Sequence, residues 1–272
     1  MLRKATEEDL SALVALRCKA AGTNRADAAG WLQNVAGLEN ILVLEKSGQP
    51  PAAMLATVPV EYGQHHGIWL CGAAGAQGVP LDRLLPKWIE SCLRAYGASG
   101  FDFAVMTSDS TQNAQTLKAL GFSGQLPLRV LQTPIRRDLL AQAVFDSLTV
   151  HKLVEMRHIY QPGCICLPEQ AMNEIMTQLY RRGLTVVSNR RGYGLYYTRG
   201  DTLQFLELQA DNDHCADLLL QAARETGAQN ARILLAENQT LYLGAGRRCG
   251  YGMIAFLGRP FPTTDAYFRM LL

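Results

Sequence analysis

The feature that most constrains the fold is an order of strands and helices that occurs twice along the chain. In the first half, the apolar run IWLCGAA (68–74) is followed by a helical stretch, the run FDFAVMT (101–107), a second helical stretch and a further apolar run. In the second half, LQFLELQ (203–209) and ARILLAE (231–237) stand in the same order, with a helical stretch between them. Strands that alternate with helices in this way predict α/β or α+β architecture, and the repeat predicts two domains of one plan.

The remainder of each half completes the plan. Residues 2–21 and 24–38 predict a short strand and two helices, and 41–75 predict three strands that turn at SGQPP and YGQHHG. Each domain should therefore contain a mixed, largely antiparallel sheet flanked by helices. The predicted boundaries are a first domain over 1–135, a helical connector over 136–164 and a second domain over 165–272. Within the second domain we expect a short helix over 238–246 before a closing strand.

Composition narrows the classes of partner. A chain of 272 residues has room for two cores, and a formal net charge of +2 favours neither nucleic acid nor a membrane surface. The opening MLRKATEEDL lacks the apolar run of a signal peptide, and no run approaches ~18 apolar residues. Seven cysteines without a CxxC pair predict a cytoplasmic protein with reduced, mostly buried thiols. The sequence leaves the oligomeric state open.

The stretch CGAAGAQGVPLDRLL, which begins at Cys71, joins the end of a strand to the start of a helix through a glycine-rich turn. Main-chain N–H groups and a helix N-terminus both attract anions, so this arrangement is typical of phosphate binding. A dinucleotide-binding turn with Asp102 about 20 residues on is a poor match, because the glycines follow G-x-x-G-x-x-G rather than G-x-G-x-x-G. The strands before the turn also form a meander rather than the start of a βαβ unit.

The run from Gly67 to Phe122 resembles the GNAT superfamily, whose members transfer an acyl group from coenzyme A to an amine. It reproduces the family order of central strand, pyrophosphate loop, long helix, splayed strand and short helix ending in Gly121-Phe122. The resemblance covers about 1–135 and, more weakly, 165–258. The twofold layout is similar to tandem GNAT proteins related to the enhanced-intracellular-survival acetyltransferases, without their carrier-protein-like third domain. The resemblance implies acetyl-CoA as cofactor and a small-molecule or peptide amine as acceptor.

The family loop reads R/Q-x-x-G-x-G/A, and its match here is degenerate. The resemblance places the cofactor against a set of main-chain and loop positions, namely Cys71, Gly72, Ala73, Gln77, Gly78, Val79 and Asp82. Pro80 and Asp82 stand where the family has glycines; Pro80 has no N–H, and Asp82 is predicted to cap the following helix. The tyrosine that the family uses to protonate the leaving thiolate is replaced by Leu117.

Other candidates lie on neighbouring strands and turns. Glu61, with Tyr62 beside it, is the best-placed group to act as a base toward an amine, although a solvated hairpin residue is the simpler interpretation. Ser108, Asp109, Ser110 and Asn113 are either cofactor contacts or a helix N-cap cluster. His65-His66 is expected to have no acidic or cysteine ligand nearby, so an exposed hairpin is expected rather than a metal site.

Two functions therefore remain open. One is an acetyl-CoA-dependent N-acyltransferase, and the other is a GNAT-like binding or structural module that has lost catalysis. The second domain is predicted to bind no CoA, because no glycine lies between 203 and 213 and Asp211 and Asp213 crowd the helix start.

Overall fold

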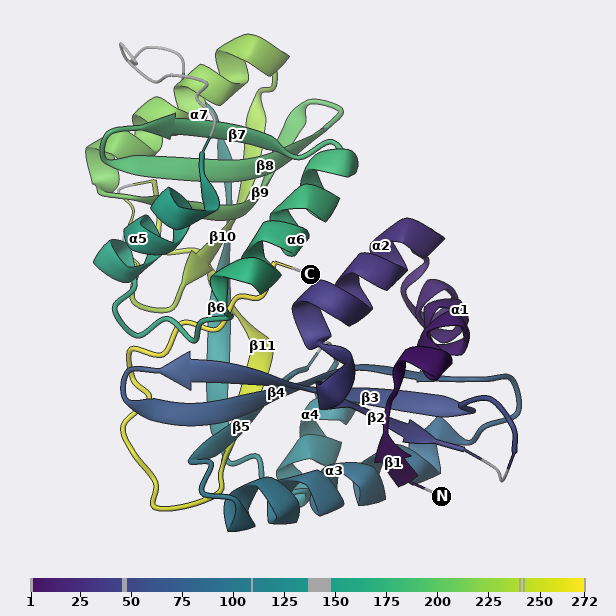
Figure 1. Ribbon diagram of the computed structural model, residues 1–272. Coiled ribbons are helices and arrows are strands. Elements are labelled where there is room, and N and C mark those ends of the chain that lie inside the picture. Colours follow the sequence, from purple (N-terminus) through teal and green to yellow (C-terminus); the bar gives the residue numbers. More distant parts are fainter. Residues whose placement is uncertain are drawn as a thin grey trace. The chain divides into compact units, whose positions relative to one another are not determined.

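The computed structural model describes residues 2–45, 48–108, 110–136, 148–239, 241 and 243–271, and these residues form two compact units (Figure 1). Unit 1 consists of Met1–Gln125, Ile165–Ile175 and Gly252–Pro262. Unit 2 consists of Leu126–Cys164, Met176–Tyr251 and Thr263–Leu272. Both are mixed α/β units, as the sequence predicts.

Unit 1 contains one mixed sheet in the order β1-β2-β3-β4-β5-β11. Its strands are β1 (Leu2–Lys4), β2 (Ile41–Leu44), β3 (Ala53–Tyr62), β4 (His65–Gly75), β5 (Phe103–Thr107) and the end of β11 (Arg247–Phe256). Its helical segments are η1 (Glu7–Asp9), α1 (Leu10–Ala21), α2 (Arg25–Gly30), η2 (Trp31–Ala36), η3 (Leu38–Asn40), α3 (Leu81–Ala98), α4 (Thr111–Ala119) and the start of α6 (Glu169–Arg181). The pair β4 and β5 is parallel, and the other neighbouring strands are antiparallel.

Local sequence explains where these elements begin and end. The Asn24 side chain accepts a hydrogen bond of 2.8 Å from the N–H of Asp27 and so caps α2. A two-residue turn joins β3 to β4, and its Gly63 has φ of +57°, which a residue with a Cβ adopts at an energetic cost. Sequence signals of this kind fix the meander that the chain shows.

The helices α3 and α4 cover one face of the unit 1 sheet (Figure 1). Trp88, Ile89 and Cys92 of α3 are buried against strand residues that include Ile68 and Leu70. The spacing of these α3 residues places them on one side of the helix, as in an amphipathic helix packed on a sheet. This layer positions α3 and α4 next to the ends of β4 and β5.

The strands of unit 2 follow the order β6-β10-β9-β8-β7 and are also mixed in direction. Its strands are β6 (Gly124–Pro134), β7 (Thr185–Asn189), β8 (Gly192–Arg199), β9 (Thr202–Ala210) and β10 (Asn230–Ala236), with helices α5 (Val150–Tyr160), the end of α6 and α7 (Asn212–Thr226). The pair β9 and β10 is parallel, like β4 and β5, and the other pairs are antiparallel. The core lies between α7 and the sheet.

The closing strand of each half does not pair within that half. β6 follows α4 in sequence but pairs with β10, from Asn230↔Pro134 to Ala236↔Leu128, and the end of β11 pairs with β5. The expectation that 1–135 alone forms one sheet and 165–258 another is therefore wrong at these two strands. Local sequence patterns carry no information about pairing partners so far apart. The domain boundaries 1–135, 136–164 and 165–272 stay a prediction.

Two other expectations concern single segments. The predicted helix over 238–246 is not a helix at the positions that the structure describes there, where turns and irregular chain replace it. Gly244 and Gly246 both have positive φ, and the Gln239 N–H closes a turn onto the Ala236 carbonyl oxygen instead of starting a helix. Much of the predicted connector, 137–147, lies outside the described residues.

Candidate functional site

β4 and β5 pair over a short distance and then separate. The parallel pairing runs from Gly67↔Phe103 to Trp69↔Val105, and no further pair between the two strands follows among the described residues. The register of β4 against β3 shifts between Met54 and Ala56, so β4 carries a bulge beyond this point. Residues 70–75 of β4 then have no strand on the β5 side, and we call them the free end of β4.

The bulge depends on a glycine. Gly72 has φ of +64°, and a Cβ placed there would come within 2.4 Å of the Trp31 ring. Trp31 is buried in η2, and the guanidinium of Arg17 lies over its ring at 4.0 Å from the centroid. The neighbouring Cys71 thiol has its pKa raised by burial, so it stays protonated and is no nucleophile near neutral pH.

A cavity of about 360 Å³ lies between α3, α4 and the end of β5. Its lining is mostly apolar, and it contains Asp82 as its one ionisable side chain among the described residues. Thr107, Gln112, Asn113 and Thr116 supply its neutral polar groups. The complete lining is Leu81, Asp82, Leu85, Pro86, Ile89, Met106, Thr107, Gln112, Asn113, Thr116, Leu117 and Leu120.

Two of the four N–H groups of the loop between β4 and α3, residues 76–80, are bonded within the protein, as is the first N–H of α3. The N–H of Ala76 donates to Ala52 O at 2.8 Å, that of Val79 to Ala76 O at 3.2 Å, and that of Leu81 to Val79 O at 2.9 Å. Pro80 has no N–H. A pyrophosphate needs several donors directed at it, and compared with a loop that has glycine at 80, Pro80 removes one donor while the bonds of Ala76 and Val79 engage two others.

Asp82 does not cap α3, which corrects the prediction. The helix begins at Leu81 with Pro80 in the N-cap position, and no side chain accepts a hydrogen bond there. Asp82 lies inside the first turn, where its exposed carboxylate still interacts favourably with the helix dipole. Pro80 occupies the N-cap position two residues earlier than the capping pattern predicts, and the Asp82 carboxylate remains next to the loop.

The candidates after β5 are engaged in local structure. The Ser110 side chain caps α4 by accepting a bond of 3.1 Å from the N–H of Asn113, and the buried Ser108 hydroxyl donates to Ser110 O at 3.2 Å. This is the N-cap interpretation of the cluster; Asp109 lies outside the described residues. Leu117 is buried at the cavity wall and supplies no proton donor.

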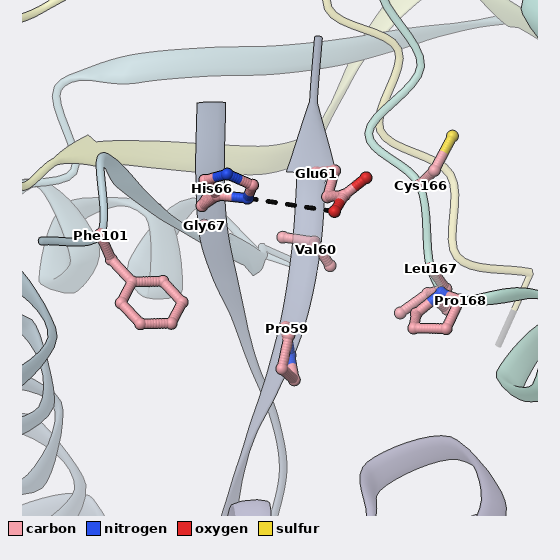
Figure 2. A pocket seen from close by; sticks show the side chains of 9 residues that line it. All are labelled: Pro59, Val60, Glu61, His66, Gly67, Phe101, Cys166, Leu167 and Pro168. Atoms are coloured by element: carbon pink, nitrogen blue, oxygen red, sulfur yellow. Dashed lines mark ion pairs between the residues drawn. The ribbon is translucent and has the colours of Figure 1, made fainter. Parts of the chain in front are cut away.

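Glu61 and Tyr62 lie in a different part of unit 1. Figure 2 shows Glu61 in a pocket of about 350 Å³ with His66, Phe101 and Cys166 on its walls. The Glu61 carboxylate is 3.9 Å from His66 Nδ1, and both side chains are about 70% exposed (72% and 70%). Glu61 pairs with His66, four residues before Leu70, so it lies roughly 13 Å from the free end of β4. The structure does not bring the proposed base and the cofactor loop together.

Neither histidine of the hairpin belongs to a metal site in the part of the chain that is described, where no group of three or more metal-binding side chains occurs. The expectation that no acidic side chain lies near the pair is wrong, because His65 lies 3.4 Å from Asp102 and His66 lies 3.9 Å from Glu61. His65 also stacks on Phe261, with ring centroids 3.8 Å apart. Within the described ranges, no helix is both long and apolar enough to cross a bilayer. None of the seven cysteines, all of which lie in the described ranges, forms a disulfide; Cys92, Cys164 and Cys215 are buried and the other four are partly exposed.

The parallel strands of unit 2 also separate, but side chains occupy the gap. The β9–β10 pairing ends at Phe205↔Ile233, and a bulge follows in β9. The Gln239 side chain then donates to Leu208 O of β9 at 2.7 Å and accepts from the N–H of Ala236 of β10 at 3.3 Å. Arg269 Nε donates to Leu206 O at 3.3 Å. Residues 206–210, the free end of β9, are therefore bonded to the protein's own side chains.

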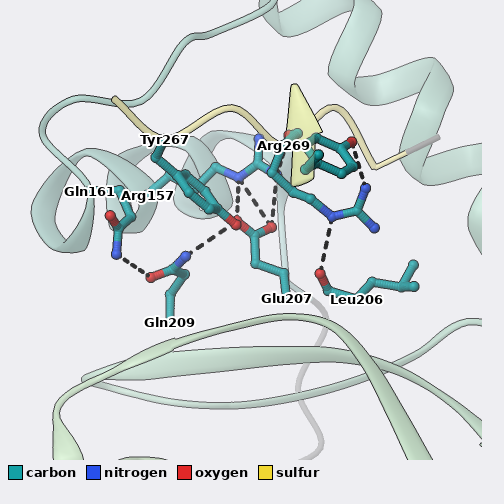
Figure 3. A network of polar contacts seen from close by, with 8 residues as sticks. Arg157, Gln161, Leu206, Glu207, Gln209, Tyr267 and Arg269 are labelled. Atoms are coloured by element: carbon teal, nitrogen blue, oxygen red, sulfur yellow. Dashed lines mark hydrogen bonds and ion pairs between the residues drawn. The ribbon is translucent and has the colours of Figure 1, made fainter. Parts of the chain in front are cut away.

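A buried polar network completes this region of unit 2 (Figure 3). Arg157 of α5 pairs with Glu207 of β9 at 2.7 Å, and Tyr267 donates to Glu207 at 3.0 Å. Arg157 and Glu207 are 3% and 0% exposed, so this is an ion pair without solvent. Sequence reasoning missed these residues, although a glutamate inside the apolar run LQFLELQ is a usable signal, because an unpaired carboxylate is not buried.

Comparison with solved structures assigns the fold. A GCN5-related N-acetyltransferase from Anabaena variabilis superposes with a TM-score of 0.71 at 13% identity, over 95% of this chain and 73% of that one. Eis1 from Mycobacterium abscessus superposes with a TM-score of 0.69 at 11% identity, over 94% and 74%. The chain therefore has the fold of the GNAT acyltransferases. No protein-family profile and no curated protein sequence matches it.

One further neighbour was solved with an acyl-CoA. The Saccharomyces cerevisiae N-myristoyltransferase with bound myristoyl-CoA superposes with a TM-score of 0.57 at 11% identity, over 96% of this chain and 83% of that one. That neighbour therefore binds an acyl-CoA. At these identities the likeness extends to the fold alone.

Proposed function

We propose that unit 1 is a ligand-binding module of the GNAT fold in which the pyrophosphate site for coenzyme A is closed. The hydrogen bonding of the β4–α3 loop carries this proposal. The N–H groups of Ala76 and Val79 in the loop and of Leu81 at the start of α3 are used within the protein, and Pro80 has none. On this proposal acetyl-CoA is not an effective cofactor.

Electrostatics act in the same direction. The Asp82 carboxylate lies in the first turn of α3, where the helix N-terminus would otherwise attract a phosphate. Each lost charge-assisted hydrogen bond weakens binding by about 1.5–3 kcal/mol. Like-charge repulsion adds to this loss. Since about 1.4 kcal/mol is tenfold in affinity, a site that was micromolar becomes about millimolar.

The missing proton donor supports loss of catalysis as well. Leu117 stands where the resemblance implies a tyrosine, and the cavity has no ionisable side chain besides Asp82 among its described residues. Acyl transfer needs a group that protonates the departing thiolate, and the described lining contains no tyrosine, histidine, cysteine or lysine for this step. Ligand binding without acyl transfer is the function that agrees with this lining.

An acetyl-CoA-dependent N-acyltransferase on a small-molecule or peptide amine is the second candidate. The free end of β4 favours it, because none of the described side chains bonds to the main chain of residues 70–75. In that case Glu61 and Tyr62 are the candidate catalytic residues, and the main chain at 71–73 and 77–79 the candidate cofactor contacts.

Calorimetric titration of CoA into three proteins separates the candidates. We expect about millimolar binding to the native chain and at least about tenfold tighter binding to Pro80→Gly/Asp82→Gly, which restores both glycines. Asp82→Ala is the matched control; it removes the charge but leaves Pro80, and should recover part of the gain. Low-micromolar binding to the native chain, with acetyl-CoA consumed in the presence of an amine, would support the acyltransferase instead.

A further inference from the structure

A separate cavity of unit 1 lies at the edge of the sheet and shares no lining residue with the α3–α4 cavity. Its volume is about 320 Å³, which is within the range of small-molecule sites. The second half of α3 forms one wall, and β1 and β2 form the other. We call it the edge cavity; its lining is Leu2, Lys4, Leu42, Ser91, Cys92, Ala95, Tyr96 and Ser99.

The pleat of β1 divides its charged side chains between the two faces of the sheet. Lys4 lies opposite Leu42 in the antiparallel pair, and both line the edge cavity. Arg3 lies on the other face, where its guanidinium is 2.6 Å from the carboxylates of Asp9 and Glu45. Both carboxylates are therefore taken by Arg3. Among the described residues, the Lys4 ammonium has no acidic partner, and no acidic side chain lines the cavity.

The inner wall of the edge cavity is uncharged at neutral pH. Burial raises the pKa of the Cys92 thiol to about 11, and it also raises the pKa of the Tyr96 hydroxyl. Thr57 gives its one hydroxyl proton to Asn40 O at 2.9 Å, so Tyr96 is the donor in its 2.6 Å bond to Thr57. Tyr96 therefore has no proton left for a ligand.

The two serines of the lining differ in what they can donate. Ser99 Oγ donates to Ala95 O at 2.9 Å, whereas no hydrogen bond of the Ser91 hydroxyl occurs in the part of the chain that is described. Lys4 and Ser91 thus remain as donors for a ligand. The rest of the lining is largely apolar, and Leu2 in it is 43% exposed. A ligand that complements this lining has one negative group and an apolar body.

We propose that the edge cavity binds an aliphatic monocarboxylate of about eight carbons. Its carboxylate pairs with the Lys4 ammonium and accepts from the Ser91 hydroxyl, and its chain lies against Leu2, Leu42 and Ala95. A multiply charged anion is disfavoured because a single lysine faces it, and an amine is repelled by that lysine. The inference goes beyond the proposed function, because the edge cavity contains no residue of the β4–α3 loop.

Three probes with one chain and different charge test the ligand class. Thermal shift and calorimetry would use octanoate, 1-octanol and octylamine. We expect octanoate to raise the unfolding midpoint, since a ligand that binds only the folded state does so. Because an exposed ion pair contributes modestly, octanoate should bind about three- to fivefold tighter than octanol, with octylamine the weakest. From hexanoate to octanoate the affinity should rise by up to about tenfold, as two more methylenes are buried.

Two pairs of variants test the location. Lys4→Met keeps the apolar stem and removes the charge, so it should reduce octanoate binding to the level of octanol and leave octanol binding unchanged. Its matched control is Lys19→Met, an exposed lysine of α1 outside the lining. Ala95→Trp fills the cavity and should abolish binding of both probes. Ala98→Trp, at an exposed position of the same helix outside the lining, should retain it.

Each outcome decides one part of the proposal. Octanoate binding that weakens in Lys4→Met and Ala95→Trp, but not in their controls, supports it. No octanoate binding to the native chain up to about 10 mM overturns it. Equal binding of octanoate and octanol overturns the assignment of a carboxylate, and octanoate binding unchanged in Lys4→Met and Ala95→Trp overturns the location. The CoA titration reports on a different part of unit 1, so the failure of either proposal is visible by itself.

Discussion

The free ends of β4 and β9 are the most informative comparison in this protein. Each follows a short parallel pairing and a bulge, so the backbone plan is shared. At β9 the main chain is bonded to Gln239 and Arg269, whereas at β4 no described side chain takes that place. The comparison shows that strand ends of the same geometry expose the same main-chain N–H and C=O groups. These groups need hydrogen-bond partners, which either the protein or a ligand must supply.

The regions also differ in what lies beside the separated strands. In unit 1, the Trp31 ring packs directly on Gly72. In unit 2, the buried pair Arg157–Glu207 and the Tyr267 hydroxyl lie there instead. Apolar packing tolerates nearby rearrangement on ligand binding, whereas a buried charge pair depends on complete hydrogen bonding. This contrast supports a binding role for unit 1 and a structural role for unit 2.

The largest expected effect comes from breaking the buried pair. Glu207→Leu leaves the Arg157 guanidinium buried without its carboxylate, and this should lower the free energy of unfolding of unit 2 by about 3–5 kcal/mol. All three tryptophans, Trp31, Trp69 and Trp88, belong to unit 1. Urea titration should therefore shift the circular dichroism transition and leave the tryptophan fluorescence transition nearly unchanged.

The double variant Arg157→Met/Glu207→Leu is the control for that result. Removing both charges should recover much of the loss, because the penalty arises from the unpaired charge rather than from the absence of the pair. Equal destabilisation by the single and double variants would show that packing, and not charge, makes this region rigid.

A smaller effect is expected where Gln239 fills the gap. Gln239→Ala deprives the Leu208 carbonyl oxygen and the Ala236 N–H of their partner. Because buried groups are then left unsatisfied, the free energy of unfolding should fall by about 1–3 kcal/mol. Urea titration of circular dichroism measures the change, with Gln132→Ala, an exposed glutamine of β6 in the same unit, as the control. Recovery of stability by added acetamide would sharpen the comparison, since the small amide would replace the missing side chain. An unchanged midpoint would mean that water satisfies these groups and that the comparison with unit 1 fails.

The smallest effect concerns acid stability of unit 1. The Arg3 guanidinium, 2.6 Å from the Asp9 carboxylate, holds the pKa of Asp9 at about 2, below its ordinary value. A lowered folded-state pKa stabilises the protein above about pH 4, and this contribution is lost as the pH falls from about 4 to 2. Asp9→Asn should lower the stability of unit 1 at neutral pH by about 1 kcal/mol, given solvent near the pair. Tryptophan fluorescence recorded against pH measures this loss of stability. If the variant unfolds in acid at the same pH as the native protein, acid unfolding depends on other carboxylates.

Much of the fold could be predicted from the sequence, because its signals are local. The apolar runs of 41–75 with the turns between them, the amphipathic pattern of α3 and the cap at Asn24 all act over a few residues. Strand pairing was predicted wherever turns are short, as at Gly63. It failed for β6 and β11, whose partners β10 and β5 are distant in the chain. The predicted helix over 238–246 failed for a related reason, since Gln239 is bonded to a strand about thirty residues earlier.

The sequence by itself determined the repeated plan, the loop at Gln77–Val79 with its Pro80 and Asp82, and the absence of a tyrosine at 117, because these are matters of residue identity. Only the tertiary structure decided which main-chain groups remain available. Whether the N–H of Leu81 or the carbonyl of Leu208 is already bonded depends on atoms brought together by folding. A hydrogen bond requires donor and acceptor within about 3 Å, and such distances across the chain are set by packing rather than by neighbouring residues.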